Sequence, residues 1–452
     1  MVATALSGSV LSGAMAAEKV TEPKEVKKAV VKVVKAEKVE KKVDVVEKAV
    51  EKKEEPQKLV IGGQLRLRSE NIFHQEAFKP SSPNNDANIL LRARINVDAK
   101  PVDHVRVFIQ PQFSRLFGQE GSTIANNSTV SASTDVIDLH QGYMDLTQIG
   151  GSAFSLRVGR QELSYGDERL IGALDWDNKG RNFDAAKLRY EKEKFWIDVF
   201  SSYNQKPGSV ASGAKEVFGG IYGSHKVSQA FAYDVYALGL NDTPGTGTDL
   251  RLATFGTRLV GTLLESNQLD YNAEGAIQTG KTGGNTILAF MGHAAAGYTF
   301  DQSLKPRLGL EYNFASGDKS STSKVERFHN LFPTNHNKYG YIDFVGLRNI
   351  HDINPSVMIK PGKATVELSY HMFLLPQTSD GLYQASGASL RSGVAGASHL
   401  AGHEADLLVK YPFNKNFSTL AGYSLFKGGK FFSDTGVNGT AHFGYLQGVA
   451  SF

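Results

Sequence analysis

Apolar and polar side chains alternate with a period of two in many short segments from residue 59 to the C-terminus. In residues 65–68 the two leucines face one way and the two arginines the other, and residues 91–95 repeat this pattern. Residues 105–110, 307–314 and 366–371 alternate in the same manner. A period of two is typical of β-strands with one apolar face. So many strands along the chain predict an all-β protein.

The connections between these strands alternate between short and long. Short turns are expected near residues 101–104, 148–153, 191–194, 227–230, 301–306 and 412–416, and longer polar loops at 118–134, 166–181, 317–340 and 376–401. Aromatic residues gather near the short turns: Tyr190, Trp196, Tyr298, Phe300, Tyr411, Phe413 and Phe417. Short periplasmic turns, long external loops and an interfacial aromatic girdle are features of outer-membrane barrels. The pattern predicts a single transmembrane antiparallel β-barrel of about eighteen strands, with both termini periplasmic.

Composition agrees with a barrel. The chain has 452 residues, 46 glycines, 10% aromatic residues and no cysteine, and its mean hydropathy is −0.27. No apolar run reaches the roughly 20 residues of a transmembrane helix, whereas alternating lipid-facing and lumen-facing residues give a polar average. The competing all-β interpretation is a soluble propeller or sandwich. It would require repeats that the sequence lacks, or arginines inside a core.

Two segments precede the predicted barrel. Residues 1–17 are small and apolar and end in Ala14-Met15-Ala16, the pattern of a signal-peptide cleavage site, although the basic start of a signal peptide is missing. Residues 18–58 contain thirteen lysines and ten acidic residues, with valines at helical spacing. We interpret them as a periplasmic tail that is either helical or a disordered spacer. Because this tail carries +3 of the formal charge of +4, the basic balance does not indicate nucleic-acid binding.

Several motifs in the barrel region resemble the alginate-export porin family. They are Val158-Gly159-Arg160-Gln161-Glu162-Leu163-Ser164-Tyr165-Gly166-Asp167-Glu168-Arg169-Leu170 with Trp176 and Arg181-Asn182-Phe183-Asp184, then 274–280, 315–318, 332–336 with 340–343, and 404–407 with 422–423. Together they extend over residues 59–452. The resemblance implies an eighteen-stranded outer-membrane barrel whose lumen passes an anionic polyuronate such as alginate. The resemblance also admits general porins for small anions or organic acids as members of this family.

A channel for anions needs fixed positive charge along its wall, and arginine offers carboxylates a planar, permanently charged fork. All seventeen arginines lie in the barrel region and none in the tail. Alternation places these residues in the lumen: Arg66, Arg68, Arg92, Arg94, Arg106, Lys187, Arg189, Arg258 and Arg307. Alternation from Leu156 and Val158 would put Arg160 on the lipid face, but the similar family implies an inward position, so we expect a bulge or twist near Gly159.

The loop after that strand carries Arg169 and Arg181 beside Asp167, Glu168 and Asp184. It is expected either to fold into the lumen with an ion-pair network and form a constriction, or to remain a solvated external loop. Five further acids also face inward, and most are expected to pair with arginines: Glu274, Glu311, Glu367, Glu404 and Asp406. Complete pairing would leave only mild selectivity.

The sequence contains no motif of a hydrolase, a nucleotide-binding loop or a metalloprotease, so no catalytic residue, metal or cofactor is predicted. His336, beside Asn335 and Asp343, is interpreted as a loop-packing residue. Phe452, at the end of a strand-like segment, resembles the signal read by the barrel-assembly machinery. The expected partners are outer-membrane lipid with lipopolysaccharide, and an anionic saccharide or small anion.

Three functional hypotheses remain open at this point. The first is a passive outer-membrane channel for anionic solutes, including a polyuronate. The second is a general diffusion porin with weak selectivity. The third is a structural anchor whose tail at residues 18–58 contacts the cell wall or a periplasmic partner.

Overall fold

The computed structural model describes residues 58–79, 85–117, 136–204, 215–228, 230–244, 248–263, 268–319 and 323–452. The described residues all belong to one compact unit, which spans Lys58–Phe452. The expectations for residues 1–17 and for most of the tail lie outside the described residues. The first strand begins at Leu59, directly after this boundary.

Eighteen antiparallel strands form the barrel. The first nine are β1 (Leu59–Phe73), β2 (Asn85–Val102), β3 (Val105–Phe117), β4 (Val136–Leu146), β5 (Phe154–Gln161), β6 (Phe183–Lys192), β7 (Phe195–Asn204), β8 (Lys215–Lys226) and β9 (Ala232–Thr243). The others are β10 (Leu250–Leu263), β11 (Leu269–Thr282), β12 (Asn285–Thr299), β13 (Arg307–Ala315), β15 (Ile350–Ile359), β16 (Thr365–Leu374), β19 (Leu400–Pro412), β20 (Phe417–Gly428) and β21 (Thr440–Ser451). The predicted fold class and strand number are confirmed.

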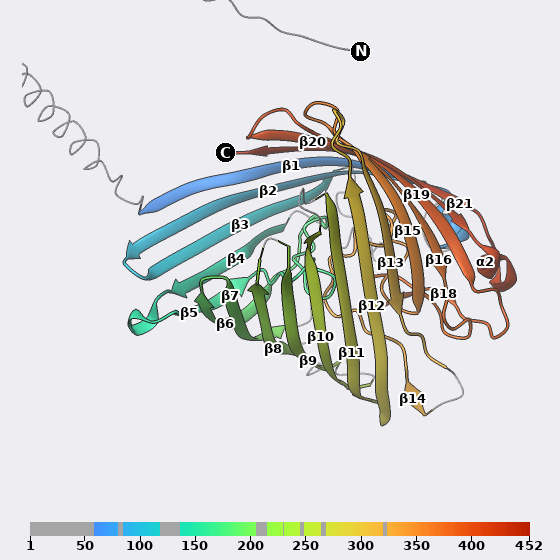
Figure 1. Ribbon diagram of the computed structural model, residues 1–452, viewed down its shortest axis with the longest axis horizontal. Coiled ribbons are helices and arrows are strands. Elements are labelled where there is room, and N and C mark those ends of the chain that lie inside the picture. Colours follow the sequence, from blue (N-terminus) through green and yellow to red (C-terminus); the bar gives the residue numbers. More distant parts are fainter. Residues whose placement is uncertain are drawn as a thin grey trace, which may run out of the picture. The chain divides into compact units, whose positions relative to one another are not determined.

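The sheet closes where β1 pairs with β21, with Gln64 opposite Ser451 and Phe73 opposite His442. Figure 1 shows the blue first strand lying beside the red last strands. Two backbone hydrogen bonds between Gly63 and Phe452, of 3.0 and 3.1 Å, extend this seam to the last residue. Each of the eighteen strands therefore pairs with a neighbour on both sides, as a closed sheet in a bilayer requires.

Side-chain direction follows the alternation along each strand. On β1, Leu65 and Leu67 face outward and are 47% and 50% exposed, whereas Arg66 and Arg68 face inward and are 3% and 1% exposed. On β1 the outward face is therefore apolar and the inward face polar, whereas strands such as β7 and β8 also turn buried aromatic residues inward, among them Phe200 and Phe218. This arrangement is the reverse of that in a soluble protein, and it suits a barrel surrounded by lipid.

The short turns gather at the end of the barrel where β1 begins and β21 ends, because each follows a strand that runs away from the long loops. Aromatic pairs lie near these turns, among them Phe154 with Tyr190 and Tyr298 with Phe300. Trp196 is a correction to the predicted girdle. Trp196 lies on the same face of β7 as Asp198, which is fully buried inside, and its ring stacks with that of Tyr165.

Three long connections carry chain into the barrel interior, and we name them here. Loop A is residues 162–182. Loop B is residues 316–319 and 323–349 and contains β14 (Lys324–Val325). Loop C is residues 375–399 and contains the hairpin β17 (Gly381–Tyr383) and β18 (Ser389–Ser392). The short helices are η1 (Gln75–Ala77), η2 (Ile149–Gly151) and α2 (Lys430–Thr435). Within the described residues, no helix is long and apolar enough to cross a membrane.

The outward face yields a prediction for stability. Leu67 lies near the middle of β1, and an arginine at the middle of a lipid-facing band costs about 2–4 kcal/mol. Leu67→Arg is therefore expected to lower the unfolding temperature of the barrel, followed by heat-modified mobility in gel electrophoresis. Leu67→Val, which keeps the face apolar, should leave it almost unchanged. Equal tolerance of both substitutions would contradict a lipid-facing position.

Candidate functional site

Four buried arginines on β1 and β2 hold loop A against the barrel wall. Their guanidinium groups face residues 175–179, and backbone carbonyl oxygens accept most of their hydrogen bonds. The pairs are Arg66 with Asp175 (2.6 Å) and Asp177 (3.0 Å), Arg68 with Trp176 (2.7 Å), Arg92 with Asp175 (3.0 Å) and Arg94 with Lys179 (3.3 Å). We call these four residues the arginine clasp.

Asp175 supplies the carboxylate of the clasp. Its Oδ1 atom lies 2.9 Å from Arg92 Nη2 and 3.1 Å from Arg94 Nη1. Burial of the group acts to raise the pKa of Asp175, but the guanidinium charges of Arg92, Arg66 and Arg94 outweigh it, so the pKa lies below its ordinary value. The side chain is 62% exposed, so these ion pairs are partly screened.

Trp176 is sandwiched at the centre of the clasp. The guanidinium carbon of Arg68 lies 3.7 Å from the centroid of its ring, and the ring of His336 from loop B stacks on it at 3.6 Å and 9°. His336 Nδ1 is 2.7 Å from the carboxylate of Asp343. Trp176 therefore joins loop A to loop B, and His336 serves as a packing residue.

Arg169 connects both loops to the far wall. It is 3% exposed, and its Nη2 atom lies 3.0 Å from Asp167 and 3.2 Å from Glu311 on β13. Its Nη1 atom donates to Asn313 on β13 and to the hydroxyl of Tyr339 in loop B, both at 2.9 Å. Of the two arrangements expected for loop A, the structure has the one folded into the lumen.

Loops A and B also pair backbone to backbone. The N–H of Gly172 donates to the carbonyl oxygen of Phe332, and the N–H of Phe332 donates to the carbonyl oxygen of Leu170, each at 2.9 Å. Arg181 closes this junction by donating to the carbonyl oxygens of Gly172 and Pro333. Burial lowers the pKa of Arg181 to about 10, which leaves it charged at neutral pH.

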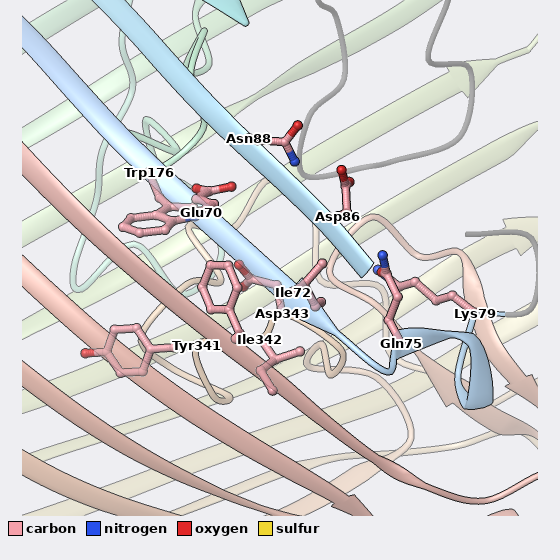
Figure 2. Close-up of a pocket in the computed structure, with 11 residues that line it drawn as sticks. Glu70, Ile72, Gln75, Lys79, Asp86, Asn88, Trp176, Tyr341, Ile342 and Asp343 are labelled. Carbon is pink, nitrogen blue, oxygen red and sulfur yellow. The ribbon is translucent and has the colours of Figure 1, made fainter. Parts of the chain in front are cut away.

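Two cavities flank Trp176 and Asp343. The larger, of about 130 Å³, lies where loops A, B and C meet and includes Arg181, Asn335 and His336 in its lining. The smaller, of about 30 Å³, is shown in Figure 2 between the strands of Glu70 and Asn88 and the loop residues Tyr341 and Asp343.

Below the loops, a row of charged side chains crosses four neighbouring strands. The register places Arg106 on β3 opposite Asp145 on β4, Asp145 opposite Arg157 on β5, and Arg157 opposite Lys187 on β6. We call these four residues the basic row. The side chains of Arg106 and Arg157 are 27% and 26% exposed, unlike those of the clasp.

The basic row is only partly neutralised. Arg157 uses Nε (2.6 Å) and Nη2 (3.0 Å) to bind Asp145, which leaves Nη1 without an acceptor in the described part of the chain. Lys187 lies 3.7 Å from Asp198 on β7, whose carboxylate is already held by Arg189 at 2.6 Å. The row therefore keeps spare donors on the lumen side.

The other predicted lumen cations lie inside with their own acids. Arg258 pairs with Asp234 at 3.2 Å and Arg307 with Asp270 at 2.6 Å. Arg106 also binds Asp98, at 2.8 Å.

The structure contradicts the predicted inward position of Arg160. Neither the β4–β5 nor the β5–β6 ladder shifts register at Gly159, so Arg160 stays on the outward register of Val158. It binds Asp184 through two hydrogen bonds of 2.8 and 3.0 Å. A register shift does occur nearby, between Gln110 and Pro111 on the β3–β4 ladder, where it turns His140 inward.

Most of the predicted inward acids lie inside the barrel, but arginine is not their usual partner. Glu274 accepts from the Tyr236 hydroxyl at 2.7 Å, and in loop A Glu168 accepts from the Thr334 hydroxyl. Glu404, fully buried, accepts from the Ile342 backbone N–H at 2.9 Å. In the described part of the chain, Glu367, Glu404 and Asp406 form no ion pair with an arginine, which corrects the expected pairing.

Sequence reasoning missed several residues of this site. Arg157 was available from alternation, because it lies between the outward residues Leu156 and Val158. Asp175 sits on a loop, and its partners are about 80 residues away, so no local pattern identifies it. The same holds for the buried tyrosine hydroxyls that bind wall carboxylates, such as Tyr165 on Asp198 and Tyr222 on Asp234.

Comparisons with known proteins agree on the fold and the family. A family model described as alginate export matches residues 57–444. The solved structure of Pseudomonas aeruginosa OccK8 (OprE) is similar at a TM-score of 0.60 and 11% identity, covering 87% of this chain and 98% of that one. The structure of Pseudomonas aeruginosa OpdO also has a TM-score of 0.60, at 13% identity, covering 88% of this chain and 97% of that one. At these identities the likeness shows the fold alone. No curated protein matches the chain.

The clasp leads to a prediction about loop A. Asp175→Asn removes the ion pairs to Arg92 and Arg94 but keeps the backbone carbonyl, and partly screened pairs of this kind contribute about 1 kcal/mol. We expect a looser loop, seen as higher open-channel noise and a larger mean conductance in planar bilayers. Asp184→Asn, on the outer face, is the matched control and should leave the current unchanged. A wild-type current from Asp175→Asn would show that the carbonyl contacts alone fix the loop.

Proposed function

The chain belongs to the alginate-export family of outer-membrane channels, and on this premise we propose that it passes anionic solutes, including a polyuronate such as alginate, down their gradient. The family and the fold are those of channels, and the barrel sits in outer-membrane lipid. The choice of solute is the new element of the proposal. We place both termini on the periplasmic side, since short turns face the periplasm in such barrels.

The basic row is the observation that carries the proposal. Three cations and one carboxylate follow each other in register across β3–β6, and Asp98 on β2 and Asp198 on β7 partly neutralise the two ends of this row. With strands about 4.8 Å apart, the row extends over about 14 Å of the wall. Arg157 and Lys187 keep donors free for a passing carboxylate. Rings or rows of arginine and lysine are the usual basis of anion preference in pores.

The clasp supports transport indirectly. Its arginines are buried and bound to loop A, so they do not contact a solute. They hold the loop across the lumen instead, and loop B is fixed to loop A through Trp176 and Arg169. The solute therefore passes a narrowed, rigid section, and the positive charge available to it comes from the basic row.

Weak selectivity is the alternative, and one observation favours it. Glu311 on β13 and Glu367 on β16 face inward. A wall with carboxylates on one side and cations on another attracts both ions, as a general diffusion porin does. The two functions therefore differ in the sign and size of ion selectivity.

Reversal potential in planar bilayers under a potassium chloride gradient tests the proposal. Wild-type protein is expected to prefer anions and to be blocked by oligouronate. Arg157→Gln should lower the anion-to-cation permeability ratio roughly two- to five-fold, the weight of one partly exposed charge interaction. It should also weaken the block. Asp145 keeps Arg106 as its partner in this variant, at 3.0 Å, so the wall is not left with an unpaired acid.

Arg160→Gln is the matched control, because it removes the same charge from the same strand but from the outer face. Its selectivity and block should equal those of the wild type. A wild-type channel without anion preference or block would leave the general porin as the function. An equal effect of both substitutions would mean that total charge, and not the basic row, sets the selectivity.

A further inference from the structure

A tyrosine–histidine pair is repeated three times on the outer face of the barrel. The pairs are Tyr312 with His351, Tyr370 with His403 and Tyr423 with His442, each with 2.7 Å between the hydroxyl and Nδ1. In every pair the tyrosine lies opposite the residue two positions after the histidine on the neighbouring strand. The repeat occupies three hairpins, β13–β15, β16–β19 and β20–β21, near their long-loop ends.

These pairs mark the upper limit of the apolar band. On β19 the outward positions run from His403 through Leu407 and Val409 to Tyr411 near the short turn. Eight residues of strand extend about 26 Å, which is a rise of about 20 Å at a strand tilt of about 40°. Because the lipid-facing band of an outer-membrane barrel is about 25 Å tall and aromatic residues flank it at both interfaces, His403 stands near the upper edge of the band, where a long side chain reaches the headgroups.

A row of hydrogen-bond donors lies at this level. His403 on β19 is opposite Lys427 on β20, and Lys427 is opposite Thr440 on β21. All three side chains face outward, because the intervening Glu404, Phe426 and Ala441 are fully buried inside. The row spans about 10 Å, two strand spacings. We call it the outer row.

The outer row carries positive charge that the protein does not neutralise. Lys427 forms no ion pair among the described residues, whereas lumen cations such as Arg106 and Arg258 do. Since Tyr370 occupies Nδ1 of His403, the other ring nitrogen, Nε2, remains for an outside partner. The lysine stem lies along the apolar wall with its ammonium group at the interface, as snorkelling side chains do.

We propose that the outer row binds a phosphate of the outer-leaflet glycolipid, with Lys427 as the charged donor and His403 and Thr440 as further donors. The occupant is fixed by position and charge: this face contacts lipid, the row lies at headgroup level, and a compact ammonium group suits phosphate. The site is distinct from the channel and rests on the proposed orientation, in which the long loops face outward. Lipid bound there stabilises the hairpins that bear loops B and C.

Native mass spectrometry of the full-length barrel in detergent, with bisphosphorylated lipid A as the probe, tests this site. The wild type should bind lipid A more tightly than monophosphoryl lipid A. Lys427→Gln should weaken lipid A binding about ten-fold, as the loss of one charge-assisted hydrogen bond requires. Thr440→Val, a milder change, should weaken it less. The channel current of both variants should equal that of the wild type, which separates this site from the proposed function.

Lys363→Gln is the control for charge. Lys363 lies in the short turn between β15 and β16 and donates to the carbonyl oxygen of Phe413, so it is at the opposite interface. Its substitution should leave lipid A binding unchanged. Wild-type binding by Lys427→Gln, or an equal loss in Lys363→Gln, would overturn the proposal, as would displacement of lipid A by millimolar inorganic phosphate.

Discussion

An arginine removed from water needs acceptors for its N–H groups, and a loop removed from water needs donors for its carbonyl groups. In this barrel the arginine N–H groups and the loop carbonyl groups satisfy each other. Arg66, Arg68, Arg92 and Arg94 stand together on β1 and β2, close enough to repel one another, and residues 175–179 turn their carbonyl oxygens toward them. The path of loop A through the lumen follows from this exchange.

Loop A in turn positions the other loops. Loop B pairs with it in strand-like fashion at Phe332 and stacks on it through His336. Loop C contacts loop B in two places. The backbone carbonyl oxygen of Tyr383 accepts a hydrogen bond from the Gly346 N–H, and the Asp380 carboxylate binds Arg327. An apolar core then forms inside the barrel, where loop residues such as Phe344 and Leu382 join inward wall residues such as Phe426. Eighteen strands enclose more space than wall side chains fill, and the loops occupy the excess.

The sequence could predict whatever depends on neighbours two residues apart. Strand positions and the inward direction of Arg66, Arg106 and Arg258 follow from the side-chain period of a strand, which is a local property. Arg160 was misplaced because a family resemblance was preferred to that period. Trp196 was misplaced because closeness to a turn does not determine the face on which a ring lies. Asp175 and Trp176 could not be predicted, since their roles depend on partners far away in the sequence.

The electric field in the lumen depends on how the charged side chains are arranged and not on their total charge. The region after residue 58 contains 37 basic and 36 acidic residues, so its sum is close to zero. Buried pairs such as Arg169 with Asp167 cancel locally and are invisible to a solute. In the basic row, by contrast, the cations are partly exposed. Arg106 binds both Asp98 and Asp145, Arg157 shares Asp145 with it, and Lys187 shares Asp198 with Arg189. Under the proposed function a solute carboxylate meets these cations on β3–β6, and the inward Glu367 on β16 moderates the anion preference.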